Sequence, residues 1–273
     1  MAVGGIDELL RSRELTANLV RRDLKVRHRG TFLGMLWSLT TPLLLVALYY
    51  FVFTYIFKVR TVPDAVRPDG SLVPFAVYFF GGLTIWNLFA SAVGASTGSV
   101  IGSGYLLNKV YFPRSVLPLS TVLSAVVTFA FELAVLAVAT LVFVGLPTFQ
   151  ILWLPVIVLI AVVLAFGLAL LLSAVTVFLR DMAHFIGVFL QLWFWGTPII
   201  YSMTFVENNS PGLVRVLELN PMTGIVVSFR NVVMLNRPPD YKLLAYDAVV
   251  AVIALVIGAL AFNRWQKLFS EIV

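Results

Sequence analysis

Long apolar segments, separated by short polar ones, dominate the pattern of hydrophobic positions along the chain. A helix that spans a membrane needs about 20 consecutive, mostly apolar residues. Six segments meet this requirement, namely residues 35–57, 75–100, 116–146, 151–179, 185–206 and 243–262. Four of them carry no charged residue, whereas the third contains Glu132 and the last contains Asp247. The pattern therefore predicts an all-α membrane protein with six transmembrane helices.

The segment before the first span has a different pattern. Between residues 6 and 28, apolar positions are interleaved with arginines and acidic residues at helical spacing. Such a helix lies in the plane of the membrane interface, with its basic end among anionic lipid headgroups. We therefore predict that residues 1–34 form a cytoplasmic amphipathic interface helix and that residues 35–273 form one transmembrane domain. A basic orientation signal without any further role is the alternative interpretation.

Two short helices are predicted between the fifth and sixth spans, within residues 207–242. Residues 212–219 and 222–235 are apolar enough for helices but too short to cross a membrane. Pro221 suits the first turn of the second helix, and Asn220 suits its cap. Helices of this kind are re-entrant or interfacial, held at membrane depth against other protein, and they usually line or gate a path.

The segment after the second span combines glycines with a basic, amphipathic stretch. Gly94, Gly98 and Gly102 lie on one helix face, which favours the close approach of another helix. Residues 106–114 are amphipathic and basic, and a proline stands near their end. We predict that residues 101–114 form a docking element for a cytoplasmic partner, and a plain interfacial turn is the alternative.

Composition and charge narrow the class of protein. Hydrophobic residues make up 60% of the 273 residues and charged residues 12%, which a water-soluble fold of this size cannot bury. The formal net charge is +6, with twelve Lys and Arg residues on the side of the termini and seven on the other side. This bias predicts cytoplasmic termini and leaves no case for nucleic acid as a partner. The absence of cysteine excludes disulfides and thiolate metal sites.

Motifs for catalysis or nucleotide binding are absent from the sequence. It has no phosphate-binding G-x-x-x-x-G-K-[ST] loop, no G-x-S-x-G elbow and no H-E-x-x-H. His28 and His184 lie far apart and suggest no metal site. We therefore expect no catalytic site, metal or cofactor in this chain, so that any energy comes from a partner. Glu132, deep in a span, is expected to make an interhelical hydrogen bond or to belong to a transport path.

Aromatic residues offer a candidate surface for a sugar polymer. The sequence contains 22 Phe, 9 Tyr and 6 Trp. Aromatic rings present apolar faces on which sugar rings can slide from one ring to the next. The candidate channel-lining residues are Tyr49, Phe53, Trp86, Phe89, Trp193, Trp195 and Tyr201. Aromatic belts at the two membrane interfaces are the alternative interpretation.

Five short motifs follow one another along the chain. The first is the basic stretch R-H-R-G-T-F-L-G-M-L-W-S-L-T-T-P at residues 27–42. The others are Lys109 with Phe112-Pro113-Arg114, Phe178-Leu179-Arg180-Asp181-Met182, Gly196-Thr197-Pro198-Ile199-Ile200-Tyr201 and Asn220-Pro221-Met222. Together they resemble the membrane subunits of type-2 ABC polysaccharide exporters, which export O-antigen, teichoic acid or capsule. The resemblance covers nearly the whole chain.

The resemblance implies a homodimer in the bacterial inner membrane, bound to two copies of a separate ATPase that carries ATP and Mg²⁺. It also implies a channel between the two subunits for an undecaprenyl-linked or other polyprenyl-linked polysaccharide. The residues expected near the ATPase by position are Arg27, Leu106, Asn108, Lys109, Phe112, Pro113, Arg114, Arg180 and Asp181. Residues 207–242, with Asn220 and Pro221, are expected to close the outer exit.

Three other functions stay open from the sequence. A membrane enzyme or assembly factor of envelope glycan synthesis is disfavoured because no charged cluster lies at one interface. An ABC exporter of a small amphipathic drug or lipid shares the fold, but such exporters usually have a larger external domain. A proton-coupled transporter is disfavoured because a relay needs more groups than one buried carboxylate.

Overall fold

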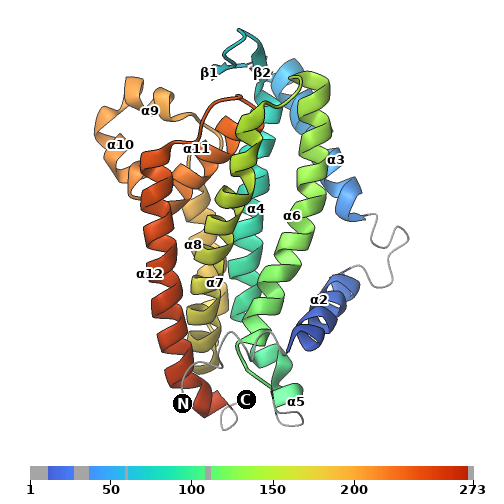
Figure 1. Cartoon of the computed structure of the whole chain (residues 1–273), viewed down its shortest axis with the longest axis vertical. Coiled ribbons are helices and arrows are strands. Elements are labelled where there is room, and N and C mark those ends of the chain that lie inside the picture. The colour runs from blue at the N-terminus through green and yellow to red at the C-terminus, as the bar shows by residue number, and fades with distance from the viewer. Residues whose placement is uncertain (1–11, 28–36, 59–60, 108–111, 270–273) are drawn as a thin grey trace.

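The computed structural model describes residues 12–27, 37–58, 61–107 and 112–269. These residues form a bundle of long helices, with a small β-hairpin and several short helices gathered at one end (Figure 1). Five of the described helices are long and apolar enough to cross a membrane. The prediction of an all-α membrane protein is therefore confirmed.

The helices differ in length and fall into two groups. The long helices are α3 (Trp37–Phe51, continued by the π-helical turn η2, Val52–Ile56), α4 (Phe75–Thr97), α6 (Val116–Phe143), α7 (Leu154–Phe178, preceded by the 3₁₀ turn η4, Phe149–Trp153) and α12 (Tyr241–Trp265). The shorter helices are α2 (Arg13–Arg27), η3 (Ile101–Ser103), α5 (Gly104–Leu107), α8 (Met182–Trp195), α9 (Met203–Asn209), α10 (Pro211–Glu218), α11 (Pro221–Val233) and η5 (Gln266–Leu268).

The two ends of the bundle carry different elements. Helix α2, α5 and the end of α12 lie at one end, called the α2 end here (Figure 1). The hairpin and helices α9, α10 and α11 lie at the other, called the hairpin end. At the α2 end, Leu19 of α2 and Phe262 of α12 belong to one buried apolar cluster. This cluster therefore extends across the α2 end of the bundle, from α2 to α12.

The fifth predicted span is shorter than the sequence suggests. Helix α8 has 14 residues and ends at Trp195, and the chain then turns through residues 196–202. A helix of that length is about 21 Å long, less than the roughly 30 Å of a bilayer core. The expectation of one apolar helix through residue 206 is wrong. Its break follows from Gly196 and Pro198, which favour turns over a continuous helix.

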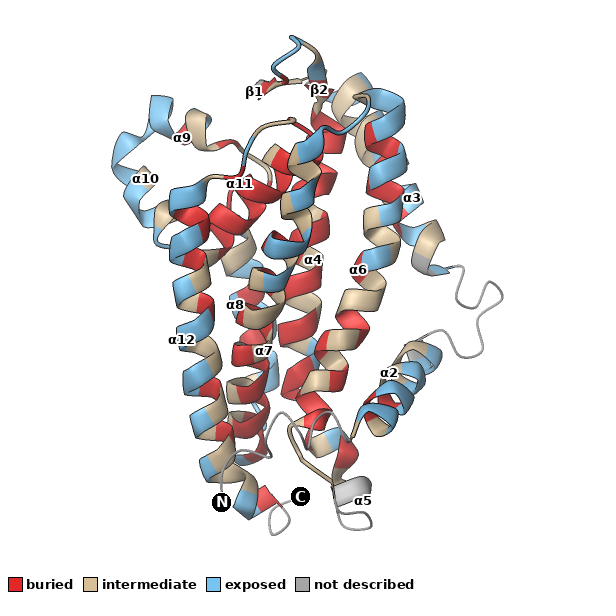
Figure 2. Ribbon diagram, in the orientation of Figure 1, coloured by how far each residue is buried: buried red, intermediate tan, exposed pale blue. Residues whose placement is uncertain are grey.

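Helix α4 occupies the centre of the bundle. It is buried along almost its whole length, whereas α3 and α12 bury only one face each (Figure 2). Helices α6 and α7 pack on either side of α4. In a membrane protein, apolar faces that stay exposed on one chain contact lipid or another copy.

Helices α7 and α12 pack closely against each other through two glycines. A Cβ atom added to Gly258 would collide with the carbonyl group of Gly167, and one added to Gly167 would collide with the backbone of Ala254 and Leu255. The glycines therefore bring the two backbones into direct contact, as small residues do in membrane bundles.

A two-stranded antiparallel hairpin, which the sequence analysis did not predict, joins the first two spans. Strands β1 (Thr61–Val66) and β2 (Leu72–Pro74) pair across a turn that contains Gly70 with a φ of 82°. Asp69 stabilises the turn because its Oδ1 accepts hydrogen bonds from Ser71 N at 2.9 Å and Ser71 Oγ at 2.6 Å. The hydroxyl bond and the backbone bond lower the pKa of the Asp69 carboxyl.

The two short helices predicted between the last spans are confirmed. Helices α10 and α11 meet at an angle of 96° at residues 219–220. Pro221 begins α11, and the Asn220 side chain caps it by accepting a hydrogen bond from Met222 N at 3.0 Å. Helix α10 is mostly exposed, whereas α11 is mostly buried. Their position at membrane depth stays a prediction.

Candidate functional site

Those predicted coupling residues that the structure describes lie at the α2 end. Phe112, Pro113 and Arg114 are half-buried before α6, and the Arg114 Nη1 atom donates a hydrogen bond to the carbonyl of Gln266. This bond ties the segment before α6 to the turn that follows α12. Asn108 and Lys109 lie outside the described residues, and the side chains of Leu106 and Arg27 do so as well.

Arg180 and Asp181 form an exposed charged step between α7 and α8. The neighbouring Phe178 contacts Trp265 of α12, with ring centroids 5.9 Å apart, which positions the loop against the end of the bundle. Within the described ranges, the one ion pair joins Arg22 and Asp23. Both charges of the loop therefore face solvent, where a partner protein can reach them.

Three of the predicted channel aromatics form one cluster between α4 and α8. Trp86 and Phe89 are buried, and Phe89 contacts the half-buried Trp193 with ring centroids 5.1 Å apart. The Trp193 Nε1 atom donates a hydrogen bond to Asn220 Oδ1 at 2.7 Å. A residue that lines a channel must expose its ring to the solute. Trp86 and Phe89 are buried in this chain and do not expose theirs. A burial of this kind depends on helix packing and leaves no local signal in the sequence.

The other predicted aromatics keep part of their surface exposed. Tyr49 and Phe53 lie half-buried on α3 and η2, and Tyr49 contacts Phe79 at a centroid distance of 4.7 Å. Trp195 is 61% exposed, and the Tyr201 hydroxyl donates to its carbonyl at 3.0 Å. For these four residues, a role in a channel stays a prediction.

Asn220 joins the end of α8 to the start of α11. Its Nδ2 atom donates to the carbonyl of Gly196 at 2.8 Å and to the Thr197 hydroxyl oxygen at 2.9 Å. Its Oδ1 atom accepts from Trp193 and from the backbone of Met222. Four hydrogen bonds satisfy the whole amide group, so the residue predicted at the exit is a structural joint between two helices.

Arg230 on α11 is a functional candidate that the sequence analysis missed. The side chain is 1% exposed, and its Nε atom donates to the carbonyl of Tyr78 at 3.0 Å. Its Nη1 atom donates to the carbonyl of Pro198 at 2.6 Å, and its Nη2 atom to that of Ile199. The guanidinium also lies 3.8 Å above the ring of Tyr78. Carbonyl oxygens and an aromatic face thus compensate a buried cation without any carboxylate.

Arg230 connects the helix that would close the exit to two other elements. Tyr78 belongs to α4, and Pro198 and Ile199 belong to the turn after α8. A Cβ atom on Gly82 would collide with the guanidinium, so this glycine provides the necessary space. The signal in the sequence was the single charge within the apolar residues 222–235.

Arg67 makes a similar set of bonds beside the hairpin. It is 4% exposed and donates to the carbonyls of Met234 at 2.9 Å, Val144 at 3.0 Å and Leu146 at 2.7 Å. These carbonyls lie just beyond the ends of α11 and α6, where backbone acceptors lack helical partners. Arg237 likewise donates to the carbonyl of Val66 at 2.6 Å. Arg67, Arg230 and Arg237, which the sequence analysis counted as loop charges, therefore make structural hydrogen bonds.

Glu132 forms an interhelical hydrogen bond, one of the two roles expected for it. Its Oε2 atom accepts from Asn87 Nδ2 at 3.1 Å, which joins α6 to α4. Within the described ranges, no group of three or more His, Asp and Glu side chains could hold a metal ion.

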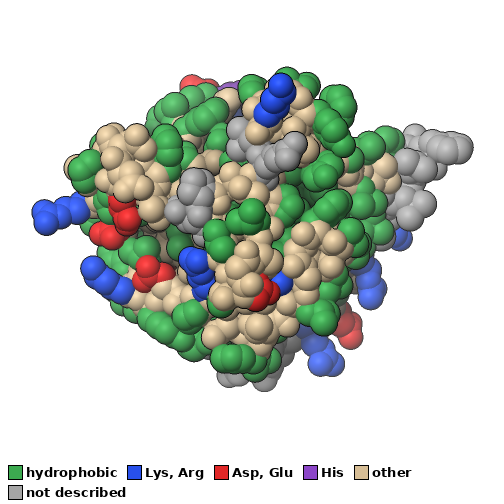
Figure 3. All heavy atoms as spheres, turned by 90° about the horizontal axis from the view of Figure 1, so that it is seen from above, with side chains coloured by type: hydrophobic (Ala, Val, Ile, Leu, Met, Phe, Trp, Pro, Cys, Tyr) green, Lys and Arg blue, Asp and Glu red, His purple; other side chains and the backbone are tan. Residues whose placement is uncertain are grey.

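Figure 3 views the molecule from the hairpin end. Charged side chains stand apart on this face, among hydrophobic and uncharged polar ones. Arg67 and Arg230 add no charge to this surface because both side chains are buried.

Comparisons with known proteins agree with this arrangement. The chain is 32% identical over 266 residues to the O-antigen export system permease protein RfbA of Myxococcus xanthus, covering 97% of this chain and 98% of that protein. It is 30% identical over 261 residues to the protein of the same name from Klebsiella pneumoniae, covering 95% of each chain. The model of the family described as ABC-2 type transporter matches residues 14–234. With this match over most of its length, the chain belongs to the ABC-2 type transporter family.

Proposed function

We propose that this chain is the membrane subunit of an ATP-driven exporter that moves a lipid-linked polysaccharide across the bacterial inner membrane. The similarity to O-antigen export permeases along almost the whole length carries the proposal. The substrate class is an O-antigen, a teichoic acid or a cell-wall galactan linked to a polyprenyl lipid. A homodimer forms the channel, since one chain buries its central helix and leaves apolar faces on α3, α8 and α12.

The two ends of the bundle suit the two tasks of such an exporter. Arg114 and the exposed Arg180 and Asp181 provide charged contacts at the α2 end, where a cytoplasmic ATPase would bind. Helices α10 and α11 at the hairpin end would close the exit. Two copies of the ATPase would bind ATP and Mg²⁺ and supply the energy.

The direct test is complementation together with co-purification. The chain is expressed with the ATPase encoded beside its gene in a strain that lacks its own exporter, and polysaccharide at the cell surface is measured. We expect surface polysaccharide and a dimeric complex that hydrolyses ATP. A chain that neither binds the ATPase nor changes its rate would contradict the proposal, and export of a small lipid alone would favour the alternative substrate class.

The coupling segment can be tested separately. Lys109→Glu with Arg114→Glu reverses two predicted contacts with the ATPase, so export should fall at least tenfold while membrane insertion stays intact. Arg114→Gln controls for the bond to Gln266, and Lys242→Glu is a matched charge reversal at the hairpin end. Unchanged export in the double variant would reject the assignment of the coupling segment.

A further inference from the structure

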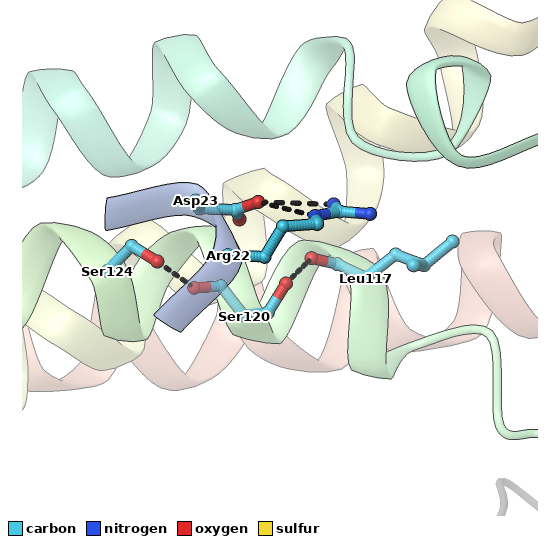
Figure 4. Close-up of polar contacts among 5 residues, drawn as sticks. All are labelled: Arg22, Asp23, Leu117, Ser120 and Ser124. Atoms are coloured by element: carbon cyan, nitrogen blue, oxygen red, sulfur yellow. Dashed lines mark hydrogen bonds and ion pairs between the residues drawn. The ribbon is translucent and has the colours of Figure 1, made fainter. Parts of the chain in front are cut away.

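A cavity of about 310 Å³ lies between α2 and the surface formed by α4, η3 and α6. Helix α2 is held beside it by Leu19, which is 4% exposed and belongs to a cluster with Val116 and Leu117. Arg22 and Asp23 of α2 line the cavity opposite α6 (Figure 4). Gly102 and Ser103, which line the cavity, belong to the predicted docking element of residues 101–114. None of the individually named coupling, channel and exit residues that the structure describes lines it.

Two glycines provide open space in this cavity. Gly98 and Gly102 line it, and no described atom lies within 4 Å of a Cβ atom added to either of them. The predicted close approach of a second helix is therefore wrong at these two positions. At Gly94 an added Cβ would make only an ordinary contact with Leu190, at 3.6 Å. A Cβ atom at Gly98 or Gly102 would therefore point into open space without a collision.

Hydroxyl groups make up most of the polar lining. Four of them donate to backbone carbonyls three or four residues earlier in the chain: Ser99 to Ser96 at 2.7 Å, and Ser120 to Leu117, Thr121 to Pro118 and Ser124 to Ser120 at 2.8 Å each. Figure 4 shows the bonds of Ser120 and Ser124. Because these protons are already used, the four oxygens can only accept further hydrogen bonds. Ser103 also lines the cavity, is 5% exposed and has no side-chain partner among the described residues. The lining thus suits a ligand with several N–H or O–H donors.

The ion pair of Arg22 and Asp23 adds one positive and one negative side chain to the lining of the cavity. Arg22 donates through Nε at 3.2 Å and Nη2 at 3.1 Å, and both bonds go to Asp23 Oδ1. The pair leaves Oδ2 of Asp23 and Nη1 of Arg22 for other partners. The charged side chains that line the cavity therefore sum to zero.

We propose that this cavity binds the headgroup of a zwitterionic phospholipid of the phosphatidylethanolamine type. The ammonium group would donate to Asp23 and to the hydroxyl oxygens, and the phosphate would accept from Arg22 and Ser103. A diphosphate would bring two negative charges to a cavity whose charged side chains sum to zero, so it matches less well. The cavity lies where α4 ends and α6 begins, as a headgroup site requires. The bound lipid holds α2 against the bundle.

Lipid binding to the purified full-length chain tests the proposal. Dioleoyl phosphatidylethanolamine, phosphatidylcholine and phosphatidylglycerol are titrated into the detergent-solubilised protein, and retained lipid is counted by native mass spectrometry. Phosphatidylcholine is the matched probe because its trimethylated nitrogen has no N–H donor. We expect about tenfold tighter binding of phosphatidylethanolamine than of phosphatidylcholine. Equal binding of these two lipids, or a preference for phosphatidylglycerol, would overturn the proposal.

Variants locate the binding to this cavity. Gly98→Leu fills the space and Asp23→Asn removes the carboxylate, so each should reduce the preference for phosphatidylethanolamine about tenfold. The matched controls are Gly187→Leu, an equally open glycine on α8, and Glu14→Gln, an exposed acid on α2. An unchanged preference in Gly98→Leu would also overturn the proposal. Size-exclusion chromatography verifies that each variant is folded, and the result does not depend on the proposed export.

Discussion

Two buried arginine side chains, Arg230 and Arg67, connect the segments at the hairpin end. Arg230 and Arg67 each donate to three backbone carbonyls on segments far apart in the sequence. Arginine suits this role because its planar group carries five donors in a fixed geometry, which lysine lacks. From the sequence, both side chains were counted only as loop charges.

Arg230→Met should destabilise the protein strongly. The change leaves the carbonyls of Tyr78, Pro198 and Ile199 without their donor, at about 1–3 kcal/mol for each buried group. We expect a loss of folded protein and a lower melting temperature, measured by fluorescence size-exclusion after heating. Arg215→Met on the exposed α10 is the matched control and should behave as wild type. Equal stability of the two variants would contradict the role of Arg230.

Two substitutions at Asn220 can distinguish its role as the cap of α11 from its role as the link to the end of α8. Asn220→Asp keeps the oxygen that accepts from Met222 and Trp193 but loses the donor to Gly196 and Thr197. Its loss of stability should be smaller than that of Asn220→Ala, which removes both sets of bonds, by about 1 kcal/mol. Thermal unfolding measures the difference, and an aspartate variant no more stable than the alanine variant would contradict the separation.

The two long helices α7 and α12 pack through direct contact between their backbones, with no large side chain between them at Gly167 and Gly258. Gly167 and Gly258 meet at the crossing, and neither leaves room for a Cβ atom. The same residue type has the opposite effect at Gly98 and Gly102, where the absent side chain leaves a cavity. The meaning of a glycine on a helix therefore depends on what lies opposite it.

Gly258→Leu should separate the two helices. The added side chain meets the backbone of Gly167, which cannot move away as a flexible side chain could. We expect little folded protein, measured as the monodisperse fraction in size-exclusion chromatography. Gly212→Leu on α10, where an added Cβ meets nothing within 4 Å, is the control. A stable Gly258→Leu variant would show that the crossing tolerates a wider spacing.

The orientation of the whole molecule can be tested because the chain contains no cysteine. Glu14 at the α2 end and Asn208 at the hairpin end are both exposed. In spheroplasts, a maleimide that does not cross membranes should label Asn208→Cys, and it should label Glu14→Cys only after permeabilisation. The excess of Lys and Arg at the α2 end gives the physical reason. The reverse labelling would contradict cytoplasmic termini.

Features that depend on one continuous segment could be predicted from the amino-acid sequence. The apolar runs predicted α4, α6, α7 and α12, because the length and charge of a segment decide whether it can cross a bilayer. The pair Asn220-Pro221 predicted the start of α11, because cap and first turn are neighbours in the chain.

The tertiary structure alone decided the contacts between distant segments. Arg230 and Tyr78 are 152 positions apart, so the single charge in an apolar segment did not indicate which carbonyls it would contact. The same reason applies to the burial of Trp86 and to the cavity beside Gly98, since each depends on which helix lies opposite. Whether a helix can enter the membrane depends on the hydrophobicity of its own sequence. Packing is a property of pairs of segments, and only the assembled bundle defines those pairs.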